Sequence, residues 1–201
     1  MPYHKLTTAV LRRGLTVALL ALSGVAGAEE QPRGRALVET CLGCHGIDSY
    51  MNAYPNYHVP KLGGQNAEYI VAALRGYKAE DRPHPTMHSQ AATLTAEEMQ
   101  QIGRFFEQAA AVESDHRGDA PAEAAACVSC HGEAGVAPSP AFPHLAGQYA
   151  DYLARSLRQY KSGERRNPIM AGFAAQLGEE DIEELAAWYA RQSGLVTPGL
   201  D

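Results

Sequence analysis

The chain has 201 residues and a formal net charge of −6 at pH 7, from 17 basic and 23 acidic side chains. This acidic balance argues against nucleic acid and anionic membrane surfaces as partners, and it favours a partner with a positively charged docking patch. Beyond the first 28 residues, no stretch is apolar enough to cross a membrane.

Residues 1–28 have the pattern of a secretory signal peptide. They contain no acidic residue, carry Lys5, Arg12 and Arg13, continue with an apolar run over residues 15–25 and end in Ala-Gly-Ala. The apolar run is too short to span a bilayer comfortably, so an uncleaved anchor is the weaker interpretation. Cleavage after Ala28 leaves 173 residues with a net charge of −9. We therefore expect a protein exported to the periplasm, without membrane insertion.

The next expected element is a helix over about residues 32–41, which leads into a Cys-x-x-Cys-His motif. This motif occurs twice, as Cys41, Cys44 and His45 and as Cys127, Cys130 and His131, and it uses all four cysteines. Two thiols three positions apart reach the two vinyl groups of one haem, and the following histidine supplies an iron ligand. The motifs predict two covalently bound haem c groups.

Other uses of paired cysteines account for the pattern less well. Two disulfides, a thioredoxin-like redox pair and a zinc site of four thiolates are all compatible with two Cys-x-x-Cys pairs. None of them requires a histidine directly after each pair.

The second half of the chain repeats the first. Residues 60–87 and 143–170 are identical at 13 of 28 positions when the offset is 83. The motifs are offset by 86, so the first half carries three extra residues in a tyrosine-rich loop between Cys44 and Pro60. A period of this length indicates a duplicated unit of about 80 residues. We expect domains at residues 29–111 and 119–201, joined by a polar linker at residues 112–118.

Each copy is expected to be mostly helical. The pattern predicts helices over residues 67–78 and 150–161, and over residues 96–110 and 179–191. Thr95 and Glu98 form a capping-box pattern at the start of one of them. A helix over residues 121–127, with Asp119 as its cap, corresponds to the helix before the first motif. No stretch shows the alternation of a strand.

Methionines are the expected ligands at the sixth iron position. Met87 and Met170 each follow a proline by two residues, and they occupy the same place in the repeat. A thioether ligand favours ferrous iron and raises the reduction potential. In the first copy, His58, His84 and His88 are alternative ligands, but none repeats and we interpret all three as surface residues. We interpret Met51 and Met99 as core residues, and His116 and His144 as surface or packing residues.

Prolines after each motif predict contacts around the haems. A ligating histidine needs an acceptor for its other ring nitrogen, often a backbone carbonyl. We expect the carbonyls of Pro60 and Pro143 to fill this role, and Leu62 and Leu145 to press on the haem faces. A plain loop turn is the alternative.

The order helix, Cys-x-x-Cys-His, Pro-x-Leu-x-Gly-Gln, helix, methionine, helix resembles a duplicated class I cytochrome c, and most closely the dihaem cytochrome c4 family. The resemblance implies an all-α fold of two tandem cytochrome c domains, each wrapped around one covalent haem c. It implies His45 with Met87, and His131 with Met170, as axial ligands. It also implies electron transfer from a quinol-oxidising complex toward a terminal oxidase.

Three functions compete at this stage. Methionines at both sixth positions favour an electron carrier that is not itself an enzyme. A dihaem peroxidase requires an open iron and usually a larger scaffold. A dedicated electron-accepting subunit of a periplasmic dehydrogenase is compatible with the same residues.

Overall fold

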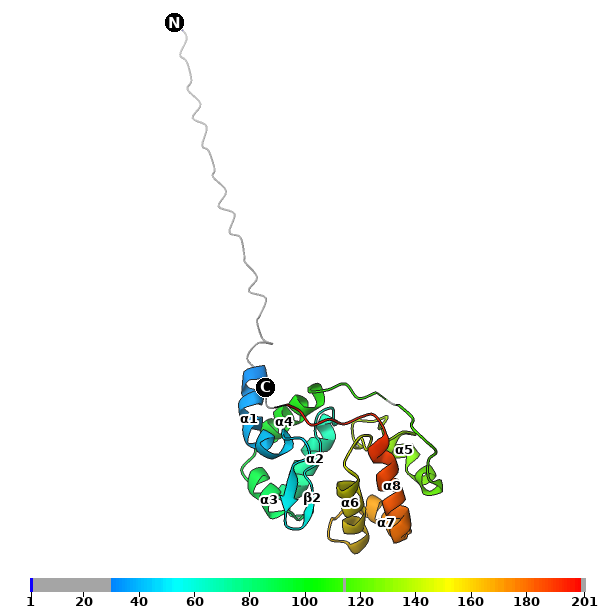
Figure 1. The fold of residues 1–201 in the computed structure, drawn as a ribbon. Helices are drawn as coiled ribbons and strands as arrows, with labels where there is room; N and C mark the ends of the chain where they lie inside the picture. The colour runs from blue at the N-terminus through cyan, green and yellow to red at the C-terminus, as the bar shows by residue number, and fades with distance from the viewer. Residues whose placement is uncertain (2–29, 114, 200–201) are drawn as a thin grey trace.

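The computed structural model describes residue 1 and residues 30–113 and 115–199, and for residues 30–34 it describes only the backbone. The predicted signal peptide therefore lies outside the described residues. Among those residues, no helix is long and apolar enough to span a bilayer. The expected all-α architecture is confirmed: helices form two groups that lie side by side (Figure 1).

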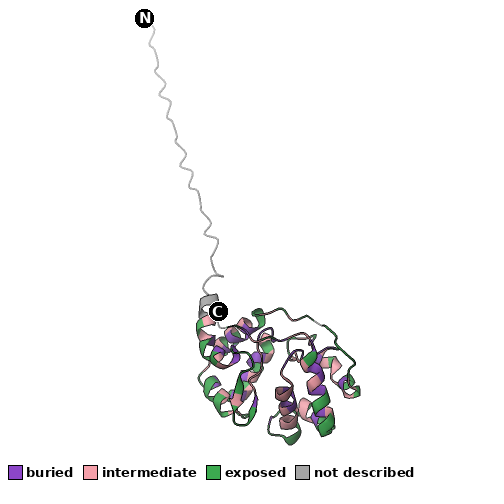
Figure 2. Cartoon of the chain, viewed as in Figure 1, coloured by how far each residue is buried: buried purple, intermediate pink, exposed green. Residues whose placement is uncertain are grey.

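The first group is built from α1 (Glu30–His45), α2 (Ala67–Lys78), α3 (Pro85–Ala91) and α4 (Ala96–Gln108). Helix α4 packs on α1 and α2, and its expected capping box between Thr95 and Glu98 is present. Figure 2 shows the buried residues on the facing sides of the helices. The core of this half contains Val38, Leu42, Ile70, Val71, Leu74, Met99, Ile102 and Phe106.

The second group repeats this arrangement with η1 (Ala122–Ala126), α5 (Val128–His131), α6 (Ala150–Ser162), α7 (Pro168–Ala174) and α8 (Glu179–Arg191). Equivalent backbone hydrogen bonds tie the loop after the motif to the last helix of each half. The Gly64 amide donates to the Phe106 carbonyl of α4 at 2.8 Å, and the Gly147 amide donates to the Tyr189 carbonyl of α8 at 3.0 Å. The core of this half contains Ala124, Leu153, Ala154, Ile182, Leu185, Ala186, Trp188 and Tyr189.

The helix before each motif differs from the prediction. Helix α1 continues through the first motif to His45, because Val38 and Leu42 lie one turn apart and are both buried in the first core. In the second half a 3₁₀ turn, η1, precedes the short α5, and Pro121 rather than Asp119 lies at its start. Only Ala124 of η1 is buried. That burial is too small to hold a longer helix, since helices in proteins depend on packing.

The hairpin of two short strands and two short helices were not predicted. Residues Met51–Ala53 (β1) and Asn56–His58 (β2) form an antiparallel hairpin in the tyrosine-rich loop, and three-residue strands are too short to reveal an alternation. Helices α3 and α7 have seven residues each, begin with a proline and carry Met87 and Met170 at their third position. Met99 is buried as expected, whereas Met51 is 43 % exposed on the hairpin and is not a core residue.

The C-terminal segment links the two halves. After α8 it passes Ala146, whose carbonyl accepts from the Leu195 amide, and then pairs Val196 with Gly63 of the first half at 2.9 and 3.1 Å. Figure 1 shows this red segment running back to end beside α1 and α4. A side chain at Gly63 would clash with Val196, so the repeat's small residue at this position allows the close approach.

Candidate haem sites

Each cysteine motif presents two free thiols and a buried histidine at the end of a helix. Cys41 and Cys44 lie three positions apart on α1, so their side chains share one helix face. Burial raises the pKa of the Cys41 thiol and of the Cys127 thiol. Both thiols are therefore protonated at neutral pH.

Both motif histidines are held by a proline carbonyl. Nδ1 of His45 lies 2.8 Å from the Pro60 oxygen, and Nδ1 of His131 lies 3.0 Å from the Pro143 oxygen. A carbonyl only accepts, so Nδ1 carries the proton and Nε2 keeps its lone pair. Burial lowers the pKa of His45 to about 4, and it also lowers the pKa of His131. The two imidazoles are thus neutral and oriented, as an iron ligand must be.

The methionines are positioned by caps at the start of α3 and α7. Nδ1 of His84 accepts from the Met87 amide at 3.3 Å, and Oδ1 of Asn167 accepts from the Met170 amide at 3.1 Å. His84 also lies 2.8 Å from the Tyr57 hydroxyl through Nε2. Both of its ring nitrogens are therefore engaged, and the sequence-based interpretation of His84 as a surface residue is wrong.

One cavity of about 460 Å³ joins the two sites. Its wall is mainly apolar and comes from both halves, which suits a large flat apolar ligand. Cys127 and Cys130 line it, whereas Cys41 and Cys44 lie outside its lining. The sequence-predicted residues brought together on its wall are His45, Pro60, Leu62, Met87, His131, Pro143, Leu145 and Met170.

Two arginines project into this cavity at equivalent positions of the repeat. Arg165 donates to the Tyr69 hydroxyl at 3.0 Å, and Arg82 donates to the Tyr152 hydroxyl, so each arginine reaches a tyrosine of the other half. Each guanidinium also lies 4.5 Å from a ring of its own half, Arg82 over Tyr77 and Arg165 over Tyr160.

These arginines test whether the cavity fits haem. Arg165 is only 6 % exposed, and within the described residues no carboxylate bonds to Arg82 or Arg165. Burial raises the pKa of Tyr69, but the two arginines lower it more, to about 8. The cavity therefore carries uncompensated positive charge, which is costly in a buried site. A haem has two carboxylates on one edge, so the residues present fit the group.

The repeated glutamines join the halves reciprocally. The Gln65 side chain donates to the His144 carbonyl at 3.0 Å and accepts from its amide at 2.9 Å. The Gln148 side chain makes the same two bonds to the Lys61 backbone at 3.0 and 2.9 Å. Both glutamines are buried, and their side chains are hydrogen-bonded to the backbone of the opposite half. The two sets of bonds are related by an approximate two-fold symmetry.

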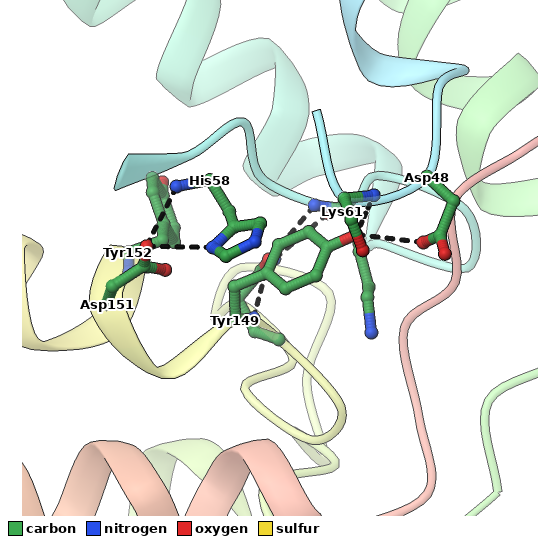
Figure 3. Close-up of polar contacts among 8 residues, drawn as sticks. Asp48, His58, Lys61, Tyr149, Asp151 and Tyr152 are labelled. Carbon is green, nitrogen blue, oxygen red and sulfur yellow. Dashed lines mark hydrogen bonds and ion pairs between the residues drawn. The ribbon is translucent and has the colours of Figure 1, made fainter. Parts of the chain in front are cut away.

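A polar cluster at the edge of this interface is shown in Figure 3. The backbone amide and Nδ1 of His58 donate to Asp151 at 3.0 and 2.8 Å, and the His58 ring stacks on Tyr149. The Tyr149 hydroxyl donates to Asp48 at 3.0 Å. His58 is therefore a partly exposed contact between the halves, rather than the solvated surface histidine that we expected.

Sequence reasoning missed the roles of the arginines, tyrosines and glutamines. The signal was available, because Tyr69, Arg82 and Gln65 all recur at the offset of 83. Repetition alone did not show that their partners lie in the other half. His88 contacts the Tyr77 carbonyl at 3.0 Å through Nδ1 and does not line the cavity. His116 is exposed beside Trp188, and His144 is half-buried, as expected of surface and packing residues.

Comparison with known proteins also finds haem-binding cytochromes. Residues 116–188 match the family model "Cytochrome C oxidase, cbb3-type, subunit III". The chain is 37 % identical to a cytochrome c4 of Stutzerimonas stutzeri, over 87 % of this chain and 93 % of that protein. It is 29 % identical to the thiosulfate dehydrogenase electron acceptor of S. stutzeri strain A1501, over 75 % and 77 % of the two chains. The crystal structure of reduced cytochrome c4 from Pseudomonas stutzeri superposes with a TM-score of 0.63 at 29 % identity, over 82 % and 98 %.

Proposed function

Since the chain belongs to the cytochrome c4 family, we propose that it is a periplasmic shuttle that takes electrons from a quinol-oxidising complex and passes them toward a terminal oxidase. It is an electron-transfer cytochrome with two covalent haem c groups. The observation that carries the proposal is the shared cavity, which has a carbonyl-held histidine and a methionine from each half on its wall.

In this proposal each half holds its haem with residues of the same type. The thiols of Cys41 and Cys44, and of Cys127 and Cys130, form the thioethers. His45 and Met87 bind one iron, and His131 and Met170 bind the other. Pro60 and Pro143 orient the imidazoles, while Leu62 and Leu145 lie against the haem faces. Each haem supplies an iron that accepts and releases one electron.

Arg82 and Arg165 complete the sites by pairing with the haem carboxylates. The crossed bonds to Tyr152 and Tyr69 would hold each guanidinium in place beside the haem carboxylates. A fixed cation beside the haem favours the reduced iron, which carries one positive charge less. In this proposal the two arginines therefore raise both reduction potentials.

Redox-titrated visible spectroscopy of the purified exported protein tests the proposal. We expect two reversible one-electron steps, the far-red absorption of methionine-ligated ferric haem, and a denaturation-resistant mass gain of two haems on residues 29–201. Cyanide binding to the untreated protein would contradict methionine ligation of both irons. Release of haem into acid acetone would contradict covalent attachment.

A second candidate is a dedicated acceptor for a periplasmic dehydrogenase. The similarity to a thiosulfate dehydrogenase electron acceptor favours it. Rapid reduction by a purified thiosulfate dehydrogenase, together with slow reduction by a quinol-oxidising complex, selects this candidate over the respiratory shuttle.

A further inference from the structure

The two methionine-bearing helices expose different surfaces. On α7, Ile169 is 61 % and Phe173 is 40 % exposed, although both line the cavity. The equivalent positions of α3 hold Thr86 and Gln90, which do not line it. Among the large exposed hydrophobic residues that the structure describes, Ile169 and Phe173 alone border the cavity. Apolar side chains at the mouth of a functional cavity are typical of a surface that another molecule covers.

Acidic side chains border this apolar pair. Helix α8 begins five residues after α7 ends, and Figure 1 shows α7 beside the start of α8. Of the acids in the first turns of α8, Glu179 and Glu183 bind Arg158, and Asp181 accepts from the Gly178 amide. Glu180 and Glu184 are exposed and have no hydrogen bond or ion pair within the described residues.

The first half lacks the same combination. At the position of Glu184, helix α4 has Gln101, whereas Glu180 has the exposed counterpart Glu97, which has no apolar pair beside it on α3. The large exposed apolar residues of the first half, Ile47, Tyr50, Met51 and Tyr54, lie in the loop after α1 and on the hairpin, and none of them lines the cavity. The duplication has therefore kept the haem-binding residues alike and made the outer surfaces different.

From this asymmetry, and resting on the proposed function, we propose that Ile169, Phe173, Glu180 and Glu184 form the docking face for a redox protein, so that electrons enter or leave at the second haem. The partner is a protein whose apolar contact centre is ringed by Lys and Arg. An apolar centre with a polar rim is the usual anatomy of a protein interface. Opposite charges on the rims raise the association rate, and salt weakens this effect.

The test measures the rate constant for electron exchange with a lysine-rich monohaem cytochrome c, used as the basic redox partner. The reference is the rate constant for reduction by a small uncharged hydroquinone. The readout is the rate constant with the monohaem cytochrome c divided by the rate constant with the hydroquinone, both expressed per haem. The variants are Ile169→Thr with Phe173→Gln, which copies the surface of α3, and Glu180→Gln. The matched controls are Met51→Thr with Tyr54→Gln on the hairpin, and Glu97→Gln at the equivalent position of α4.

We expect the α7 variant to lower this ratio about threefold or more at every ionic strength, because contact area is lost. Glu180→Gln should lower it at low ionic strength and converge with the wild type at high ionic strength. The control variants should match the wild type. Equal ratios for all variants, or a larger loss in the hairpin control, overturns the docking face while leaving the electron carrier intact. Failure of the wild type to be reduced reversibly by the hydroquinone rejects the proposed function itself.

Discussion

Met87 and Met170 occupy the third position of two short capped helices on one cavity wall, although their neighbours differ. Replacing Met87 by histidine should lower one of the two reduction potentials by on the order of 0.2 V, since axial-ligand identity spans about 0.8 V overall. The other potential should stay nearly unchanged. A spectroelectrochemical titration measures both, and the far-red absorption should fall by half.

Met51→His provides the control for this substitution, because Met51 is exposed on the hairpin. If Met87→His leaves spectrum and potential unaltered, another group binds the first iron. The positions of His84, held by Tyr57 and the Met87 amide, and of His58, held by Asp151, argue against either.

Arg165 is a buried cation that we propose to pair with a haem carboxylate. Replacing it by glutamine removes a buried cation, which should destabilise the reduced state and lower the nearer potential by on the order of tens of millivolts. Arg165→Lys should recover part of the shift. The adjacent Arg166→Gln is the matched control, because Arg166 is exposed and pairs with Asp81 at 3.3 Å. Equal potentials in all three variants would show that the arginine does not neutralise haem carboxylates.

The hairpin is the element that distinguishes the first half from the second. Strand β2 packs against α6, where Arg155 lies 4.7 Å from the Tyr57 ring and His58 binds Asp151. The three extra residues thus allow a loop of one half to brace a helix of the other.

His58→Ala should therefore destabilise the protein by about 1 kcal/mol, the usual value of one half-exposed hydrogen-bonded contact. Urea unfolding measures this loss. Asp151→Ala should give a similar loss, and the double variant should lose less than the two losses added, because both remove one interaction. Additive losses mean that the brace contributes nothing as a pair.

At the scale of the whole molecule, each half has its own small core, and we expect each to depend on its haem for stability. A unit of about 80 residues buries too little apolar surface to be strongly stable alone. Cys41→Ala with Cys44→Ala should leave the first half poorly folded while α6 and α8 keep their helicity, because the second half has its own core. Hydrogen exchange by mass spectrometry resolves the two halves. A single cooperative thermal transition at the wild-type temperature contradicts this dependence.

The glutamine pairs and the returning C-terminal segment limit that independence. Gln65 and Gln148 bind the backbone of the opposite half, and Val196 pairs with Gly63. Loss of the first half should therefore also expose amides near Val196, a readout in the same exchange experiment.

The sequence by itself determined the local chemistry. The spacing of Cys41, Cys44 and His45, and its repetition 86 residues later, indicates covalent haem. Periodicity placed α2 and α8 at their observed bounds. Such features depend on residues close together in the chain, where period and capping act directly. The hairpin and the seven-residue α3 and α7 escaped prediction because so few residues make no readable pattern.

Only the tertiary structure decided which residues meet across the two halves. Arg82 and Tyr152 are 70 residues apart, and His58 and Asp151 are 93 apart. Their contacts depend on how two separately packed cores are oriented, which no local spacing encodes. The same orientation places the repeated arginines, Arg82 and Arg165, on the wall of one shared cavity. Ile169 and Phe173 line that cavity as well, whereas their counterparts Thr86 and Gln90 do not.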